Sequence, residues 1–285
     1  MVSHVESRQI DPFGVEAQLE WAGRPTGEVA EELRQLYRRD GLVLLRSLAL
    51  SMDDQLDLCS LFGPVMRESI ENYFVSNVRP DGLLGTRELL FHNDIPYVTF
   101  PYLGGSLHAV EVEAGASPTR FASGFRAWDR MPAQLRTRVD GLTALHVRER
   151  VEGRRSRLSD MIAGDTCAAH PIIRHRESDG RAFLFVNQAM TAQIVGLDPA
   201  ESDALLEELF GYLYADDAVY EHRWTEGDIV IWDNLGVQHA RSRLTPARRT
   251  LQRVTLASVS YRDQYPLDRE VYTELKSFAE PVAAG

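Results

Sequence analysis

The spacing of hydrophobic residues changes from helical to strand-like early in the chain. Residues 27–40 repeat apolar side chains every three or four positions, which predicts an amphipathic helix that ends at Gly41. The uninterrupted apolar run 42–45 predicts a short buried strand. Residues 52–62 predict a second helix, closed by a Gly-Pro pair.

Later segments follow the same alternation. Strands are predicted at 72–76, 88–94, 106–112, 171–174, 182–186, 220–224, 228–232 and 252–260. The pair 171–174 and 182–186 is typical of a hairpin around a Ser-Asp-Gly turn. Helices are predicted over 124–140, broken at Pro132, and from Asp198-Pro199 to about Tyr214. The pattern indicates a mainly β fold with flanking helices, either a jelly roll or a β-barrel. We expect a single domain over 1–285, with a helical insert at roughly 124–168.

Composition narrows the class of protein. The 285 residues are 44% hydrophobic and 26% charged, which is ordinary for a globular chain. A net charge of −11 argues against a nucleic-acid-binding surface, and Lys276 is the single lysine. Cys59 and Cys167 are too few for a disulfide framework. Neither a signal peptide nor a membrane span is expected, so we predict a cytoplasmic location.

The triplet His92-Asn93-Asp94 carries the first candidate chemistry. In a strand, residues i and i+2 point to the same face, so His92 and Asp94 could bind one metal ion together. His239 lies beyond the apolar segment 227–234 and could supply a third ligand. Two imidazoles and one carboxylate form the facial triad of non-haem Fe(II) oxygenases. The alternative for 227–239 is a strand, an Asx turn and a surface histidine.

Two charged segments also have alternatives. If 248–253 is a strand, Arg249 and Arg253 share one face and Arg248 lies on the other. Arginines on an inner face need an anionic partner, and a dicarboxylate cosubstrate would provide one. The alternative is a surface ladder of ion pairs. The run 148–157 is dense in charge and predicts a solvated loop or helix face.

Together these motifs resemble the taurine dioxygenase-like family of Fe(II)/2-oxoglutarate oxygenases. The resemblance extends from about residue 30 to 258. It rests on these segments: 41–43, 62–64, 92–94, Thr119, 170–171, 186–187, 194–197, 232–234, His239 and 249–253. It implies a double-stranded β-helix (jelly-roll) core, with His92, Asp94 and His239 as the ligands of Fe(II).

The resemblance also implies a cosubstrate site and a substrate site. Thr119 and Arg249 would hold the distal carboxylate of 2-oxoglutarate, and Arg253 would meet an anionic group of the substrate. The chain departs from the family pattern in three places: Phe91 replaces a tryptophan before the first metal histidine, 67–84 does not match the substrate-binding segment, and 116–118 replaces a Gly-Gly-Asp run. These departures leave the metal site intact and the substrate undefined.

Several aromatic and polar residues flank the metal segment. Asn72, Tyr73, Phe91, Tyr97 and Tyr102 could line a substrate pocket, since pockets combine aromatic residues with a few polar groups. Ordinary strand packing is the alternative for each of them.

The remaining histidines and Cys167 have structural interpretations. His108 and His146 are expected to be core or surface residues, and His170 is expected to serve a turn. Cys167 has no neighbouring base in the sequence to make it a nucleophile.

The predicted function is an oxygenase that uses Fe(II), 2-oxoglutarate and O2 to hydroxylate an unactivated C–H bond of a small, anionic molecule. Desaturation, cyclisation or oxidative decarboxylation at the same site are alternatives. A non-catalytic, metal-binding jelly roll is the alternative of another class. Halogenation is disfavoured because Asp94 would occupy the position that a halide needs. Neither nucleic acid nor a membrane is expected as a partner, and a homo-oligomer stays open.

Overall fold

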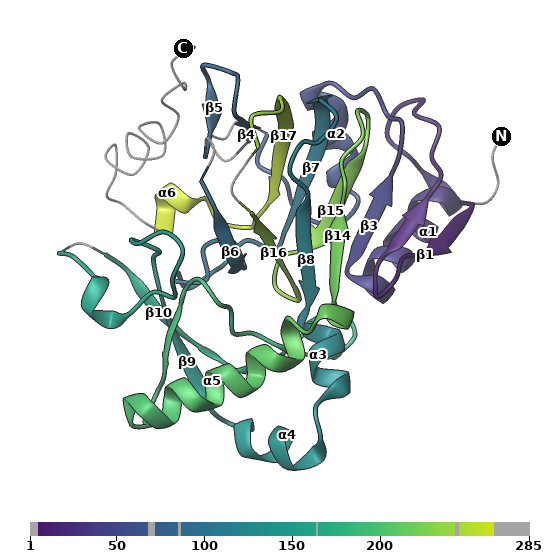
Figure 1. The fold of residues 1–285 in the computed structure, drawn as a ribbon. Coiled ribbons are helices and arrows are strands. Elements are labelled where there is room, and N and C mark those ends of the chain that lie inside the picture. Colours follow the sequence, from purple (N-terminus) through teal and green to yellow (C-terminus); the bar gives the residue numbers. More distant parts are fainter. Residues whose placement is uncertain (1–4, 68–71, 85–86, 164, 243–244, 265–285) are drawn as a thin grey trace.

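Two facing β-sheets form the centre of the molecule (Figure 1). The computed structural model describes residues 5–67, 72–84, 87–163, 165–242 and 245–264, so Lys276 lies outside the described residues. The larger sheet has the order β1 (Ser7–Gln9), β2 (Val15–Ala17), β3 (Leu42–Leu45), β15 (Ile229–Asp233), β7 (Gly104–Val112), β17 (Arg249–Leu256), β4 (Tyr73–Ser76) and β5 (Gly82–Leu83). The smaller sheet has the order β14 (Val219–His222), β8 (Thr119–Ser123), β16 (Val237–Arg241) and β6 (Leu89–His92).

Apolar side chains from both sheets meet in the space between them. Leu42 and Leu44 of β3 pack there with Phe121 of β8, whereas Val43 and Leu45 belong to a second cluster on the outer face. Burial on both faces explains the uninterrupted apolar run of this strand. The predicted jelly roll is confirmed, and within the described residues the two sheets do not close into a barrel.

Two helices cover the outer face of the larger sheet. Helix α1 (Gly27–Asp40) has the predicted bounds, and Gly41 ends it in the left-handed conformation with φ of 71°. Helix α2 (Met52–Cys59) packs on β17 through Leu56. It is three residues shorter than the predicted 52–62. The amides of Leu61 and Phe62 bond to carbonyls three residues back, which tightens the chain into a turn.

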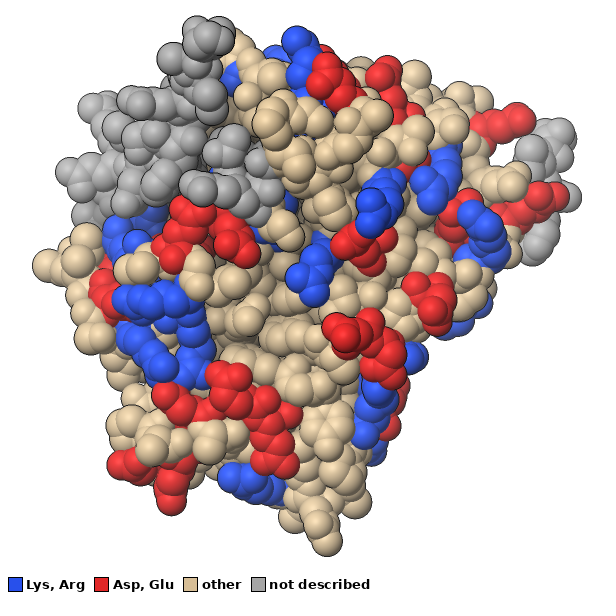
Figure 2. Space-filling model, in the orientation of Figure 1, with Lys and Arg blue, Asp and Glu red and all other residues tan. Residues whose placement is uncertain are grey.

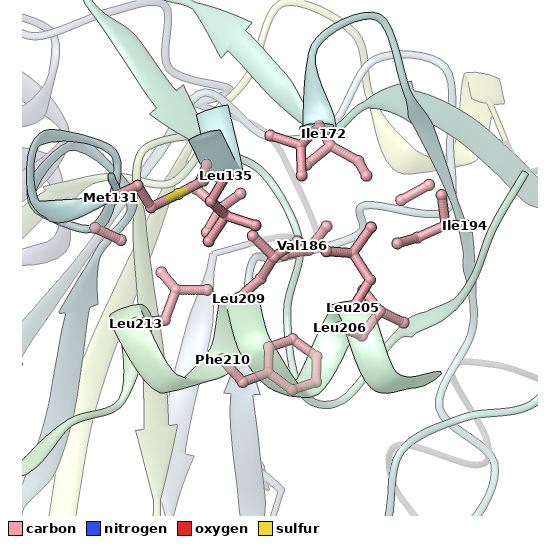
Figure 3. Packing of buried hydrophobic residues seen from close by; sticks show 14 residues of the cluster. Met131, Leu135, Ile172, Val186, Ile194, Leu205, Leu206, Leu209, Phe210 and Leu213 are labelled. Carbon is pink, nitrogen blue, oxygen red and sulfur yellow. The ribbon is translucent and has the colours of Figure 1, made fainter. Parts of the chain in front are cut away.

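A third layer lies below the sheets in the view of Figure 1. It contains helices α3 (Gly124–Arg130), α4 (Ala133–Val139) and α5 (Pro199–Leu213), a sheet of β10 (Cys167–Pro171), β9 (Thr143–Val147) and β13 (Thr191–Ile194), and the hairpin β11 (Ile173–His175) with β12 (Ala182–Leu184). Figure 3 shows the apolar side chains that α5 buries against this layer. The break at Pro132, the hairpin and the start of α5 are confirmed, the last with Asp198 as its N-cap. The last described element is α6 (Tyr261–Gln264).

The predicted strand 88–94 ends early, and several strands were not predicted. Strand β6 stops at His92, so Asp94 lies in the following bend. The unpredicted strands are β1, β2, β5, β8, β9, β13 and β16, and β10 in large part. His239 was expected after a turn at a strand end, and it lies instead in the middle of β16.

Acidic and basic side chains are intermixed on the face shown in Figure 2. Charged side chains of the protein often form ion pairs, such as Arg138 with Glu208 at 2.8 Å. The charged run 148–157 is an irregular loop, but the prediction of a solvated segment is wrong for part of it. The side chains of Glu149 and Arg155 are only 8% and 9% exposed, because they pair with Arg87 and Asp203 respectively. Among the described helices, none has both the length and the apolar character that a bilayer crossing requires.

Acid should weaken this fold through His146. Burial, followed by the charges of His170 and Arg174, lowers the pKa of His146 to about 3. An unfolded histidine has a pKa of about 6.5, so below that pH the unfolded chain binds a proton that the folded chain rejects. The contribution of His146 to stability is fully present above pH 6.5 and is lost as the pH falls toward 3. We expect a loss of about 2 kcal/mol at pH 5 from this residue.

Urea unfolding of the metal-free protein between pH 5 and 7 measures this effect. His146→Gln should flatten the pH dependence, whereas the exposed His175→Gln should leave it as in the wild type. Equal slopes for the wild type and His146→Gln would contradict the assignment.

Candidate active site

His92 and His239 face each other across two neighbouring strands. Strands β6 and β16 pair antiparallel, and His92 is the direct partner of His239 in this register. Their ring centroids are 4.2 Å apart. On the other side of β16, His239 is opposite Phe121, and it also contacts the ring of Trp232. Strand pairing thus brings together two histidines that are 147 positions apart in the sequence.

Asp94 joins this pair although it lies outside the strand. The side chain of Asn234 holds the bend, since its Oδ1 accepts the Asp94 amide at 2.8 Å and its Nδ2 donates to the Asp94 carbonyl at 3.2 Å. The Asn93 side chain donates to the Asn234 carbonyl at 2.6 Å. Asp94 Oδ1 consequently lies 3.7 Å from His92 Nε2 and 3.9 Å from His239 Nε2.

Hydrogen bonding and electrostatics favour these three side chains as ligands of a divalent metal. The Nδ1 of His92 lies 2.7 Å from the Leu90 carbonyl, which favours a proton on Nδ1 and leaves the Nε2 lone pair toward Asp94. Burial, then the neighbouring His92, lowers the pKa of His239 to about 3, so this imidazole is neutral at pH 7. Burial alone would raise the pKa of Asp94, but the charge of Arg253 and the two imidazoles lower it well below its ordinary value. One ligand atom from each residue lies within 4.8 Å of the others, so the group could hold one ion.

Arg253 lies beside the group of His92, Asp94 and His239 and pairs with Asp94. Its Nη2 is 2.6 Å from Asp94 Oδ2, the carboxylate oxygen not directed at the histidines. The guanidinium also lies 5.0 Å above the ring of Tyr73 and 5.7 Å from that of Tyr102. The sequence interpretation assigned Arg253 to an anionic substrate. The structure gives it an anionic partner inside the protein, and this pair fixes the orientation of the Asp94 carboxylate.

Arg249 and Thr119 form a second buried polar group. Arg249 Nη2 donates to Thr119 Oγ1 at 3.1 Å, and Trp224 Nε1 donates to the same oxygen at 3.0 Å. Because Thr119 Oγ1 accepts twice, its own hydroxyl proton remains to donate. Arg249 is 2% exposed, and its Nε and Nη1 have no hydrogen-bond partner among the described residues. A buried guanidinium with unpaired donors beside a hydroxyl donor fits a carboxylate ligand.

The other predicted substrate residues separate into two groups. Tyr73 faces the site, as its contact with Arg253 shows. Phe91 points away from His92 and stacks on Tyr214 at 4.5 Å. Asn72 uses its amide group within the protein, accepting from the Thr255 amide at 3.1 Å and donating to the Met66 carbonyl at 2.5 Å. The structure does not bring Asn72 or Phe91 to the metal group.

The other histidines that the structure describes lie outside the metal group. His108 and His170 are buried and contact the carbonyls of Leu48 and Val98 through Nε2, at 2.8 and 3.0 Å. His170 lies in strand β10, so the expected turn role is wrong. Cys167 is exposed and Cys59 is buried, and both are free thiols.

The fold and the site together indicate a class of enzyme, and comparison with known proteins identifies its family. A jelly roll that combines two imidazoles and one carboxylate with a buried arginine–threonine pair is typical of a non-haem Fe(II)/2-oxoglutarate-dependent dioxygenase. Residues 6–255 match the family described as taurine catabolism dioxygenase TauD, TfdA family, and the chain belongs to this family.

Individual relatives agree with this assignment. The chain is 30% identical over 258 residues to the alpha-ketoglutarate-dependent 2,4-dichlorophenoxyacetate dioxygenase of Cupriavidus pinatubonensis, covering 79% of this chain and 87% of that protein. It is 27% identical over 244 residues to the (S)-phenoxypropionate/alpha-ketoglutarate-dioxygenase of Sphingobium herbicidovorans, covering 78% and 83%. In fold it matches the crystal structure of AAD-2 in complex with Mn(II) and N-oxalylglycine, with a TM-score of 0.74 at 18% identity, covering 90% and 98%. The protein is therefore a dioxygenase that uses Fe(II), 2-oxoglutarate and O2.

Sequence reasoning missed the residues that position the site. Asn234 was noted only as part of a motif, yet it holds the Asp94 bend. The hydrogen bond from Trp224 to Thr119 and the buried Arg241, two residues after His239, were not predicted. Each depends on strand pairings or turns between distant segments. The sequence of β16 does carry one indirect signal for Arg241. His239 and Arg241 are two positions apart, so in a strand they would point to the same face.

Proposed function

We propose that this dioxygenase hydroxylates an unactivated C–H bond of a small, anionic molecule. We assign Fe(II) to His92, Asp94 and His239, and the distal carboxylate of 2-oxoglutarate to Arg249 and Thr119. The observation that carries the proposal is the approach of His92 Nε2, Asp94 Oδ1 and His239 Nε2 within one small group. When bound, the metal with 2-oxoglutarate and O2 supplies the oxidant, and succinate and CO2 are released.

The residues of the chain bind and orient the reactants. Arg249 and Thr119 offer a carboxylate at least three donors, which would fix the cosubstrate at its far end. The Arg253–Asp94 pair keeps the carboxylate ligand in one orientation. Phe121 and Trp232 are fully buried against His239, so one wall of the site excludes water.

The proposal of an anionic substrate has two supports. The site is rich in arginine, with Arg241, Arg249 and Arg253 each at most 5% exposed. Two relatives are named for 2,4-dichlorophenoxyacetate and (S)-phenoxypropionate, which are both carboxylates. An arginine-lined site would favour such acids over neutral analogues.

Substrate-stimulated succinate formation tests the function. The purified protein with Fe(II), ascorbate and 2-oxoglutarate should release succinate faster when an acid from a panel of carboxylates, sulfonates and phosphonates is added. Mass spectrometry should then show that the product has gained one oxygen atom. A product that has instead lost two hydrogen atoms would make desaturation the reaction. No succinate under any condition would contradict the assignment of the site.

A further inference from the structure

Arg241 places a third arginine in the interior of the jelly roll. It follows His239 by two positions on β16, so both side chains point to the same face of the smaller sheet. It is 3% exposed. It lies close enough to Arg249 and Tyr73 to act on both of them electrostatically. Arg241 therefore borders the same interior as the metal group and the clamp for 2-oxoglutarate.

The guanidinium of Arg241 is held in place without being neutralised. Its Nη2 donates to the carbonyls of Arg87 and Leu84 at 2.6 and 3.0 Å, and its Nε donates to the Arg87 carbonyl at 3.2 Å. Its Nη1 is buried and has no hydrogen-bond partner among the described residues. No carboxylate of those residues pairs with it within 4 Å, and Glu152 acts on it only from farther away. A buried, oriented and unpaired donor on a cation is a position for an anion.

The other two arginines are already assigned. Arg253 has Asp94 as its anionic partner at 2.6 Å. Arg249 is bound to Thr119, and together they suit one carboxylate. Arg241 is tied instead to the connection that leads into β6, and it acts on Tyr73, whose ring lies under Arg253 beside Asp94. Arg241 is thus a neighbour of Tyr73, which in turn borders the metal group through Arg253.

We propose that Arg241 receives the anionic group of the organic substrate through Nη1, and so selects small organic acids over their neutral analogues. The inference rests on the proposed function, because it names a residue that recognises the substrate of that reaction. Since one nitrogen is available, the contact is end-on rather than a bidentate fork. The same chemistry would accept a carboxylate, a sulfonate or a phosphonate.

Binding measurements on matched acids and amides test this role. The enzyme is loaded anaerobically with Fe(II) and 2-oxoglutarate and titrated calorimetrically with 2,4-dichlorophenoxyacetate, phenoxypropionate, benzoate and taurine, and with the primary amide of each carboxylate. The wild type should bind at least one of the carboxylates about 10- to 100-fold more tightly than its amide. Arg241→Gln should remove that preference, with amide affinity and 2-oxoglutarate affinity changed by no more than about twofold.

Two further variants separate recognition from folding. Arg241→Lys also loses the geometry of the three carbonyl bonds but keeps the charge, so it should recover part of the preference for acids. Arg223→Gln removes an arginine whose side chain is 83% exposed and should behave as the wild type. A thermal melt on each variant checks that it is folded.

The outcomes distinguish this inference from the proposed function. If the wild type shows no preference for any of the carboxylates, or if Arg241→Gln keeps that preference, Arg241 does not select the substrate. A loss of 2-oxoglutarate affinity larger than the loss of acid affinity would place Arg241 in the cosubstrate clamp and overturn the proposal. Failure of the wild type to bind 2-oxoglutarate and release succinate would instead contradict the proposed function itself.

Discussion

His239→Ala is expected to abolish Fe(II)-dependent release of succinate and to weaken Fe(II) binding by more than about 100-fold. Loss of residues that merely support a ligand costs about 10- to 100-fold in metal affinity, so the loss of a ligand should cost more. The imidazole that this variant removes is only 12% exposed and is neutral at pH 7, and its Nε2 lies 3.9 Å from Asp94 Oδ1. His92→Ala should have the same effect, because the two rings face each other on paired strands.

Anaerobic Fe(II) titration of the purified variants measures this loss directly. The control is His175→Ala, which removes an exposed imidazole on β11 and should bind Fe(II) as the wild type does. His239 also packs on Trp232, with ring centroids 4.9 Å apart, so the melting temperature of His239→Ala must be compared as well. Wild-type Fe(II) affinity and turnover in a folded His239→Ala protein would show that the metal lies elsewhere.

The hydrophobic pattern of the sequence predicts an element correctly where the buried side chains are the apolar ones. Helix α1 and strand β3 lie where the periodicity places them, because their apolar side chains form the contacts that bury them. Strand β16 was missed for the opposite reason. Its sequence, VQHAR, looks like a polar loop, yet most of the strand is buried. Its polar side chains are satisfied inside the protein; Gln238, for example, donates to the Val186 carbonyl at 2.6 Å.

The three candidate metal ligands could be predicted from their residue types, but the residues that hold them in position could not. The i, i+2 argument selected His92 and Asp94 as partners, although Asp94 follows the strand and is positioned by Asn234, 140 residues away in the sequence. The pairing of Arg253 with Asp94 spans 159 residues. Such contacts depend on which strands become neighbours, and no spacing along the chain encodes that. For the same reason, the side-chain directions of Phe91 and Arg241 were not available from the sequence.

Arg249→Gln is expected to raise the KM for 2-oxoglutarate by about 10²- to 10³-fold, because a buried charged donor to a carboxylate contributes several kcal/mol. The increase should be the same with every organic substrate, since in the proposed assignment Arg249 and Thr119 contact only the cosubstrate. Arg249→Lys should recover only part of the loss, as an ammonium cannot reproduce the planar set of donors. Thr119→Val should cost less, about tenfold, because it removes one neutral hydroxyl.

The matched control for this prediction is the preceding residue. Arg248 lies next to Arg249 in the sequence, but its side chain is 54% exposed and pairs with Glu111 at the surface. Arg248→Gln removes the same charge from almost the same position, so any long-range electrostatic effect on 2-oxoglutarate should appear in both variants. Titrations of each variant in 2-oxoglutarate, with and without organic substrate, give the comparison. A steep increase confined to Arg249→Gln supports direct contact. Equal increases in both variants would show that the loss of one positive charge, and not a contact of Arg249, weakens 2-oxoglutarate binding. A change in substrate affinity alone would show that Arg249 contacts the organic substrate.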